Sequence, residues 1–145
     1  MYTIDASVHV NALNPAEAGS AASQALLESI RARGCPLFSP TLLLVEVAAA
    51  IANVLGDAER ALQLAVALAG LPNQVLVSLD DALAERAAAL AATARLRGAD
   101  AVYAAVAQQY GTTLITLDQQ QLERLTPFLR TARPADVLSD LGTTD

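Results

Sequence analysis

The sequence predicts an α/β fold with a largely parallel sheet and helices on both faces. Short runs of β-prone residues alternate with longer stretches whose apolar residues recur at helical spacing. Glycine and proline residues separate many of these runs. This alternation favours a parallel sheet covered by helices. With 145 residues and a mass of 15.0 kDa, we expect one domain that spans residues 1–145.

Four runs predict strands, and a fifth run is a candidate. Apolar and β-branched residues dominate them, and polar or turn-forming residues bound them. The clearest is the run Thr113-Leu-Ile-Thr-Leu, which Asp118 closes. The predicted strands are residues 2–5, 36–39, 75–78 and 113–117, with the fifth near residues 128–131.

The stretches between these runs predict helices. Gly34 is a natural end for the first helix, and Asp57 is a natural cap for the third. We expect Ser39 to cap the second helix and Pro40 to begin it, because the missing N–H of proline costs nothing there. The predicted helices are residues 20–33, 40–55, 57–70, 80–97 and 98–111, with a short helix after residue 118 and a turn or helix after residue 134.

The composition excludes several classes of protein. The chain is 54% hydrophobic and only 17% charged, which is too apolar for intrinsic disorder. Its single cysteine, Cys35, excludes a disulfide scaffold and a zinc finger. The net charge is −6 and every basic residue is arginine, which disfavours a protein that coats nucleic acid but leaves local phosphate contact open. We predict no membrane span and no export signal, and therefore a cytoplasmic protein.

Four carboxylates stand at unusual places in the sequence. Glu46 is the only charge between residues 41 and 56, and a helix that is apolar all round is predicted to be buried. Asp100 is alone in an uncharged helical start, and Asp5 and Asp118 each follow a short apolar strand. Each residue has an ordinary interpretation, a solvated rim for Glu46 and a helix cap or turn for the three aspartates. Clustered together, the four would repel one another, and a hard divalent cation would relieve that repulsion.

Four short motifs hold these carboxylates in a fixed order. They are Asp5-Ala-Ser7 after a strand, Glu46 in an apolar helix, Gly98-Ala-Asp100 at a helix start, and Thr116-Leu-Asp118 after a strand. In this order, over essentially the whole chain, the sequence resembles the PIN-domain family, and most of all its VapC-type toxins from toxin–antitoxin pairs. The resemblance implies a PIN-like three-layer sandwich with a central, mostly parallel sheet of four to five short strands and helices on both faces.

The resemblance also implies an activity and a set of site residues. The implied activity is that of a magnesium- or manganese-dependent endoribonuclease, with RNA as its substrate. A small cognate antitoxin protein and a second copy of the chain, in a homodimer, are the implied partners. The antitoxin would dock between the helices at residues 20–33 and 57–70. The implied catalytic and metal-binding residues are Asp5, Glu46, Asp100 and Asp118, and the hydroxyls that support them are Ser7 and Thr116.

Two departures from the family pattern stand out. Many relatives have a further acidic residue shortly after the last aspartate, whereas Asp118 is followed by three glutamines, so we expect weaker metal occupancy. The acidic chain also offers few arginines to hold RNA. The main candidates are Arg95, Arg97 and Arg124, with Arg130 and Arg133 near the carboxyl terminus, although an arginine on a solvated helix face needs no function.

Other functions stay open or are disfavoured by single residues. Ser7 stands where a haloacid-dehalogenase-type phosphatase needs a second aspartate, and the chain has no lysine for a response-regulator receiver. A housekeeping RNA-processing nuclease and a degenerate PIN-like binding module both stay open. His9 is the only histidine, so it is expected to be structural, and no Ser-His-Asp triad or histidine metal site is expected.

Overall fold

The computed structural model describes residues 1–142, and its centre is a five-stranded sheet in the order β3-β2-β1-β4-β5. Every pair of neighbouring strands in it is parallel, which confirms the predicted sheet. The last three residues of the predicted domain, 143–145, lie outside the described part of the chain. The strands are β1 (Tyr2–Ile4), β2 (Leu37–Pro40), β3 (Gln74–Val77), β4 (Thr113–Ile115) and β5 (Thr131–Ala132).

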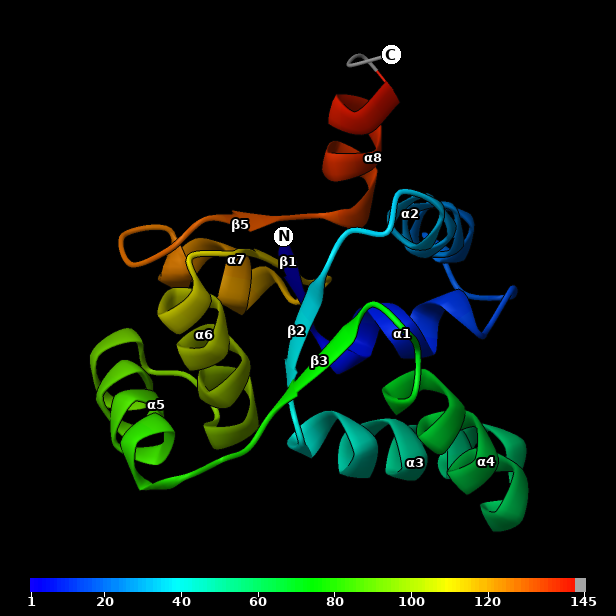
Figure 1. The fold of residues 1–145 in the computed structure, drawn as a ribbon, viewed down its shortest axis with the longest axis horizontal. Coiled ribbons are helices and arrows are strands. Elements are labelled where there is room, and N and C mark those ends of the chain that lie inside the picture. Colours follow the sequence, from blue (N-terminus) through cyan, green and yellow to red (C-terminus); the bar gives the residue numbers. More distant parts are fainter. Residues whose placement is uncertain (143–145) are drawn as a thin grey trace.

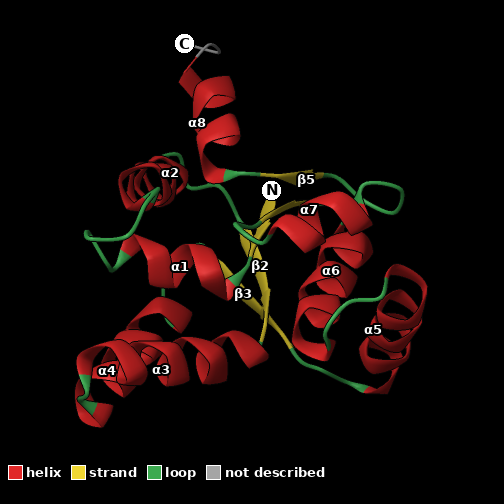
Figure 2. Ribbon diagram, turned by 180° about the vertical axis from the view of Figure 1, so that it is seen from behind, coloured by secondary structure: helices red, strands yellow, loops and turns green. Residues whose placement is uncertain are grey.

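Helices cover both faces of the sheet, as predicted. Figures 1 and 2 show α5 and α6 on one side of the strands and α1 to α4 on the other. The carboxyl-terminal α8 lies beside α2. The helices are α1 (Ala6–Ala12), α2 (Ser20–Ala32), α3 (Leu42–Leu55), α4 (Ala58–Ala69), α5 (Asp81–Ala94), α6 (Gly98–Tyr110), α7 (Gln119–Leu125) and α8 (Pro134–Gly142).

The two faces of the sheet bury separate sets of side chains. Ile4 of β1 and Ile115 of β4 pack against α1, α2 and α8, and both are fully buried. Leu114, the neighbour of Ile115, packs on the other side with the buried residues of α6. This alternation follows from the pleat, which turns successive side chains to opposite faces. The central strands therefore hold their carboxyl ends in fixed positions.

Helix α1 has no counterpart in the sequence prediction. Its apolar residues Ala6, Val8, Val10 and Ala12 alternate with polar ones, and seven residues are too few to establish a helical period. The helix forms because Asp5 caps it: the Asp5 carboxylate accepts a hydrogen bond from the backbone N–H of Ser7 at 3.3 Å. The residue singled out for chemistry therefore also begins a helix.

Helix α3 differs from its prediction both in where it begins and in how far it is buried. Ser39 and Pro40 belong to β2 and do not begin the helix, because β2 continues alongside β3 and the Thr41 N–H donates to the carbonyl of Val77 at 2.9 Å. The helix is also not buried all round. Val45 is 62% exposed and Val54 is 58% exposed, so α3 has an apolar face that other described residues leave uncovered.

Smaller differences concern element ends. Helix α5 ends at Ala94 instead of residue 97, because Arg95 adopts a left-handed conformation with φ of 55°. Strand β4 ends at Ile115 and not at residue 117, and the fifth strand begins at Thr131. The predicted cap of α4 is confirmed, since the Asp57 side chain accepts from the Arg60 N–H. Among residues 1–142, no helix is long and apolar enough to cross a membrane.

Candidate active site

Two of the four carboxylates follow adjacent strands. Asp5 comes directly after β1, and Asp118 lies three residues after the end of β4, which pairs with β1. Each caps the next helix, and the Asp118 carboxylate accepts from the Gln121 N–H at 3.1 Å. Parallel strands end at the same edge of a sheet, and ligands bind at that edge in α/β folds. The topology therefore places both side chains at the edge where a site is expected.

Two hydroxyls hold the Asp5 carboxylate. The Ser7 hydroxyl donates to Asp5 Oδ2 at 2.5 Å, and the Thr116 hydroxyl donates to the same oxygen at 3.4 Å. Thr116 Oγ1 in turn accepts from the Asp118 N–H at 3.1 Å. The structure thus places the Ser7 and Thr116 hydroxyls in contact with a site carboxylate, Asp5, as the family resemblance implied. Their contacts fix the orientation of Asp5 and couple it to the start of α7.

Asp5 and Glu46 form an inner pair of carboxylates, with Asp5 buried and Glu46 half-buried. Burial raises the pKa of Asp5; the hydrogen bond from Ser7 opposes this, and the negative charge of Asp100 adds to it. Burial also raises the pKa of Glu46, and the charge of Asp5 raises it further. The charge of Asp5 therefore disfavours the ionised form of Glu46, although the two carboxylates come from different elements.

Asp100 and Asp118 form an outer pair, and Arg97 joins them. Arg97 Nε donates to Asp100 Oδ2 at 2.9 Å, and its Nη2 donates to Asp118 Oδ2 at 3.3 Å. The Arg97 side chain is 75% exposed, against 13% for Asp100 and 27% for Asp118. Hydrogen bonding to Asp100 is the main reason that the pKa of Arg97 is raised. The outer pair thus has a cationic partner from the chain itself.

Gln121 is a site residue that the sequence analysis noted only as a missing acid. Its side chain is buried, and its Nε2 donates to Asp100 Oδ1 at 3.1 Å. Its backbone N–H also donates to Asp118, so one residue contacts both members of the outer pair. The available signal was its position in the first turn of a helix capped by a site aspartate. Gln121 therefore supplies a neutral donor close to the outer carboxylates.

The other predicted arginines do different things. Arg124 Nη1 donates to the backbone carbonyl of Arg95 at 2.5 Å, so it braces the turn between α5 and α6. Of Arg95, Arg97 and Arg124, the structure shows Arg97 in contact with the carboxylates. Arg133 lies at a groove and donates to Gln119. Of these arginines, Arg97 contacts the carboxylates, whereas Arg124 and Arg133 contact other groups.

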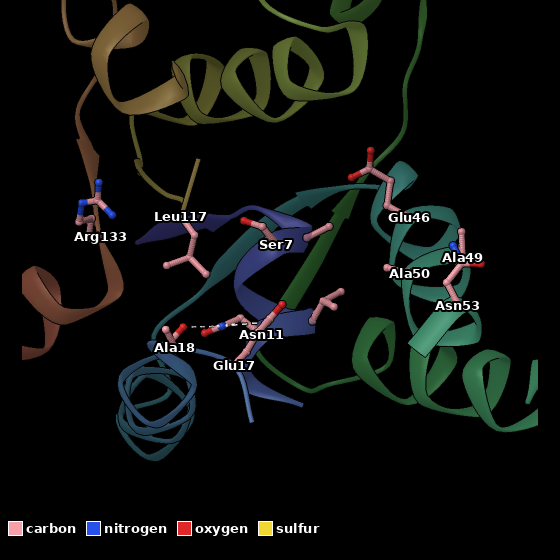
Figure 3. Close-up of a pocket in the computed structure, with 12 residues that line it drawn as sticks. Ser7, Asn11, Glu17, Ala18, Glu46, Ala49, Ala50, Asn53, Leu117 and Arg133 are labelled. Carbon is pink, nitrogen blue, oxygen red and sulfur yellow. Dashed lines mark hydrogen bonds between the residues drawn. The ribbon is translucent and has the colours of Figure 1, made fainter. Parts of the chain in front are cut away.

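An open groove of about 910 Å³ runs along α1 and α3, and Glu46 is the site carboxylate that lines it. Figure 3 shows Ser7 and Glu46 lining this groove, with Leu117 and Arg133 on its other side. The exposed Ala49 and the half-buried Ala50 keep the α3 wall narrow and apolar. The groove can therefore admit an extended polar chain to the edge where the carboxylates lie.

The donor set fits a hard divalent cation in its chemistry. Carboxylate and hydroxyl oxygens are the ligands that Mg²⁺ and Mn²⁺ prefer. Burial, with a smaller contribution from neighbouring acids, raises the pKa values of Asp5 and Glu46, and a cation would offset both effects. In the described residues, however, no three acidic, histidine or cysteine side chains are gathered closely enough to hold an ion. Arg97 lies on the outer pair instead, so a bound cation requires the side chains to rearrange.

Two further buried groups lie near or behind this site. Burial raises the pKa of the Tyr103 hydroxyl well above its usual range, and the charge of Glu46 adds to it. His9 is buried, its ring nitrogens have no hydrogen-bond partner within residues 1–142, and burial lowers its pKa to about 4. His9 is therefore neutral, in agreement with the structural role expected for it.

The comparisons with known proteins agree with this fold. The family model described as PIN domain matches residues 2–126. VapC20 of Mycobacterium tuberculosis, a toxin that cleaves the sarcin-ricin loop, has a similar structure, with a TM-score of 0.71 and 18% identity over 82% of this chain and 91% of that one. FitAcB from Neisseria gonorrhoeae gives 0.70 and 21% over 92% and 98%. VapBC2 from Rickettsia felis, bound to a promoter DNA fragment, gives 0.68 and 13% over 91% and 97%. No curated protein sequence matches the chain.

Proposed function

The chain belongs to the PIN-domain family, and from this premise we propose that it is a metal-dependent endoribonuclease that acts as the toxin of a toxin–antitoxin pair. One observation supports the activity most directly. Besides burial, the charge of Asp100 raises the pKa of Asp5 and of Glu46, and the charge of Asp5 raises that of Glu46, so carboxylates from three separate elements act on the same region. A fold has no structural need for such repulsion, so a cationic ligand is the simplest reason for it.

In this proposal Asp5, Glu46, Asp100 and Asp118 hold Mg²⁺ or Mn²⁺. When bound, the ion supplies activation of a water molecule and neutralisation of charge on the leaving phosphodiester oxygen. Ser7 and Thr116 keep Asp5 in one orientation through the hydrogen bonds described above. Side chains held in this way lose little freedom when substrate arrives, which lowers the cost of reaching the productive geometry.

The groove and its arginines hold the RNA in this proposal. Arg97 stands at the carboxylates and Arg133 on the groove wall, so each can donate to a phosphate oxygen. With a net charge of −6, the chain would bind RNA through such local contacts and not through a broad basic surface. Arg95 lies in the turn before α6, and Arg124 of α7 donates to its carbonyl; their contact with RNA stays a prediction.

Cleavage of total cellular RNA tests the activity. The purified protein is incubated with RNA and Mn²⁺ or Mg²⁺, and then with EDTA, beside the Asp100→Asn variant. Discrete fragments that require the metal and disappear in the variant are expected, with the fold retained by circular dichroism. Asp81→Asn is the matched control, because Asp81 is exposed in the first turn of α5. Cleavage by Asp100→Asn at the wild-type rate would contradict the site, and no cleavage by the wild type would favour the degenerate binding module.

The proposed partner is a small antitoxin protein that covers an apolar surface. A toxin–antitoxin complex from Klebsiella pneumoniae is among the similar structures, which suggests a partner of this kind. In this chain, Leu13, Val54 and Leu55 are each more than half exposed, and they line a cavity of about 270 Å³ between α1, α3 and α4. An amphipathic helix with apolar anchors would fill that cavity. A homodimer is proposed on the family resemblance alone, and the cytoplasmic location expected from the sequence stays a prediction.

Growth of a bacterial host separates a toxin from a housekeeping nuclease. Induction of the wild-type chain alone is expected to arrest growth, and Asp100→Asn is expected not to. Cleavage in vitro without growth arrest would favour the housekeeping nuclease. Asp81→Asn, which keeps all the proposed site residues, should arrest growth like the wild type.

A further inference from the structure

Arg97 is the feature of the site that its chemistry least requires. A cation site made of carboxylates gains nothing from a guanidinium among its ligands, because like charges repel. Arg97 nevertheless donates to Oδ2 of Asp100 and to Oδ2 of Asp118, and so joins the first turn of α6 to the start of α7. The carboxylate oxygens it uses belong to two of the four proposed metal ligands.

The position of Arg97 leaves it free to move. It is the residue just before α6, its side chain makes no capping hydrogen bond, and three-quarters of that side chain is exposed. The carboxylates that it contacts are much more enclosed. The guanidinium can therefore leave for solvent, whereas the aspartates stay at the sheet edge.

The charge of Arg97 also reaches the inner pair. It lowers the pKa of Glu46, and Asp5 in turn raises the pKa of Arg97. The guanidinium thus supplies part of the positive charge that a divalent cation would supply. No three acidic, histidine or cysteine side chains in residues 1–142 are gathered to hold an ion while Arg97 occupies this place.

We propose that Arg97 is an internal counter-ion that competes with the divalent cation for Asp100 and Asp118 and must be displaced before the metal binds. This inference rests on the proposed function, because it assumes that the site takes a metal. Once displaced, the guanidinium lies beside the groove and can pair with a phosphate of the RNA instead. Substrate and metal then favour each other's binding, because the phosphate holds Arg97 away from the carboxylates.

Titration of the metal-free protein with Mn²⁺ alone tests the competition, by calorimetry or by loss of the free Mn²⁺ signal in electron paramagnetic resonance. Arg97→Ala is expected to bind Mn²⁺ about three- to thirtyfold more tightly than the wild type, the range that two partly exposed ion pairs can account for. Arg97→Lys, which keeps the charge but not the planar fork, should fall between them.

Arg86→Ala is the control for net charge. Arg86 lies exposed on α5 and has one weak side-chain contact of its own, with Gln108. Its loss should change the Mn²⁺ dissociation constant by less than about twofold. In cleavage assays, Arg97→Ala should also raise the KM for RNA, so that metal and substrate affinities move in opposite directions. A residue with a purely structural role would weaken both.

Each outcome bears on the inference. If Arg97→Ala binds Mn²⁺ no more tightly than Arg86→Ala while the wild type binds and cleaves, the competition is refuted and the nuclease stands. If neither the wild type nor Arg97→Ala binds Mn²⁺, both the competition and the metal-dependent function are refuted. Circular dichroism shows whether Arg97→Ala is folded, and Arg97→Gln, which keeps hydrogen-bond donors without charge, should shift the affinity in the same direction.

Discussion

The inner and outer carboxylate pairs are the same chemical group in two different environments. Asp5 is buried and Glu46 half-buried, and burial raises the pKa of each. Asp100 and Asp118 are reached by a guanidinium, and Gln121 donates to both of them. Within residues 1–142, no ion pair reaches the inner pair, whereas Arg97 forms ion pairs with both members of the outer pair. A metal ion would relieve repulsion on the inner side and replace a partner on the outer side.

Removing an inner carboxylate should have the largest effect, with opposite signs for activity and stability. Asp5→Asn keeps the cap of α1, because asparagine caps helices as well as aspartate does, and it still accepts from Ser7. Loss of a metal ligand should lower cleavage on the order of a thousandfold. Since the raised pKa of Asp5 means that its ionised form destabilises the metal-free fold, the variant should unfold at a higher urea concentration.

The comparison fails if Asp5→Asn destabilises the metal-free protein as much as a cavity mutation in the core would. Urea unfolding in EDTA measures this directly, and Ser7→Ala is the matched variant that removes a neighbouring hydroxyl but keeps the charge. Ser7→Ala should raise the pKa of Asp5 further, because it removes the hydrogen bond that lowers it.

Adding a carboxylate on the outer side should make that side resemble the inner one. Gln121→Glu places an acid beside Asp100 at a buried position. Without metal, an uncompensated buried charge should cost roughly 3 kcal/mol in the free energy of unfolding. Saturating Mn²⁺ should restore most of that loss, and the variant should bind Mn²⁺ more tightly than the wild type. Equal urea midpoints for the two proteins in EDTA would contradict this.

His9 tests the effect of burial on a basic group, whose pKa burial lowers instead of raising. Burial raises the pKa of the inner acids but lowers that of His9 to about 4, below its ordinary value of 6.5. Between these two pKa values His9 is protonated in the unfolded chain but not in the folded one. The stability of the fold with neutral His9 is therefore fully present above pH 6.5 and decreases as the pH falls. Between pH 7 and pH 5 the loss is about 2 kcal/mol.

The measurement compares urea unfolding of the wild type and His9→Leu at both pH values. The carboxylates titrate in both proteins, so their effect cancels in the difference. If the wild type loses no more stability than His9→Leu, the imidazole of His9 becomes protonated in the folded protein as well, and the prediction is wrong.

Much of the fold was predictable because its signals are local. The strand 113–117, the glycine stops and the cap at Asp57 depend on residues within a few positions of one another. Helix α1 was not predictable in this way, because its seven residues alternate like a strand and its stability comes from the cap at Asp5. The exposed face of α3 has a similar cause, since an apolar sequence does not show which side lacks a packing partner.

The site residues also divide into those that local sequence signals reveal and those that they do not. The carboxylates were visible as charges in apolar surroundings, and their convergence follows from parallel topology. The contacts of Arg97 and Gln121 were not visible, because each depends on the spacing between α6 and α7. Sequence reasoning thus found the carboxylates and named Arg97 as a candidate for holding RNA, but it missed the contacts that Arg97 and Gln121 make with the carboxylates.

Breaking one outer ion pair should have the smallest effect. Asp118→Asn keeps the cap of α7, so the change isolates the pair with Arg97. At an Arg97 that is 75% exposed, the pair should contribute less than about 1 kcal/mol to metal-free stability, and 1 M NaCl should remove most of it. Thermal unfolding in EDTA at low and high salt measures this. A larger loss that persists in high salt would mean that the ion pair with Arg97 is shielded from solvent, and the contrast between the two pairs would be wrong.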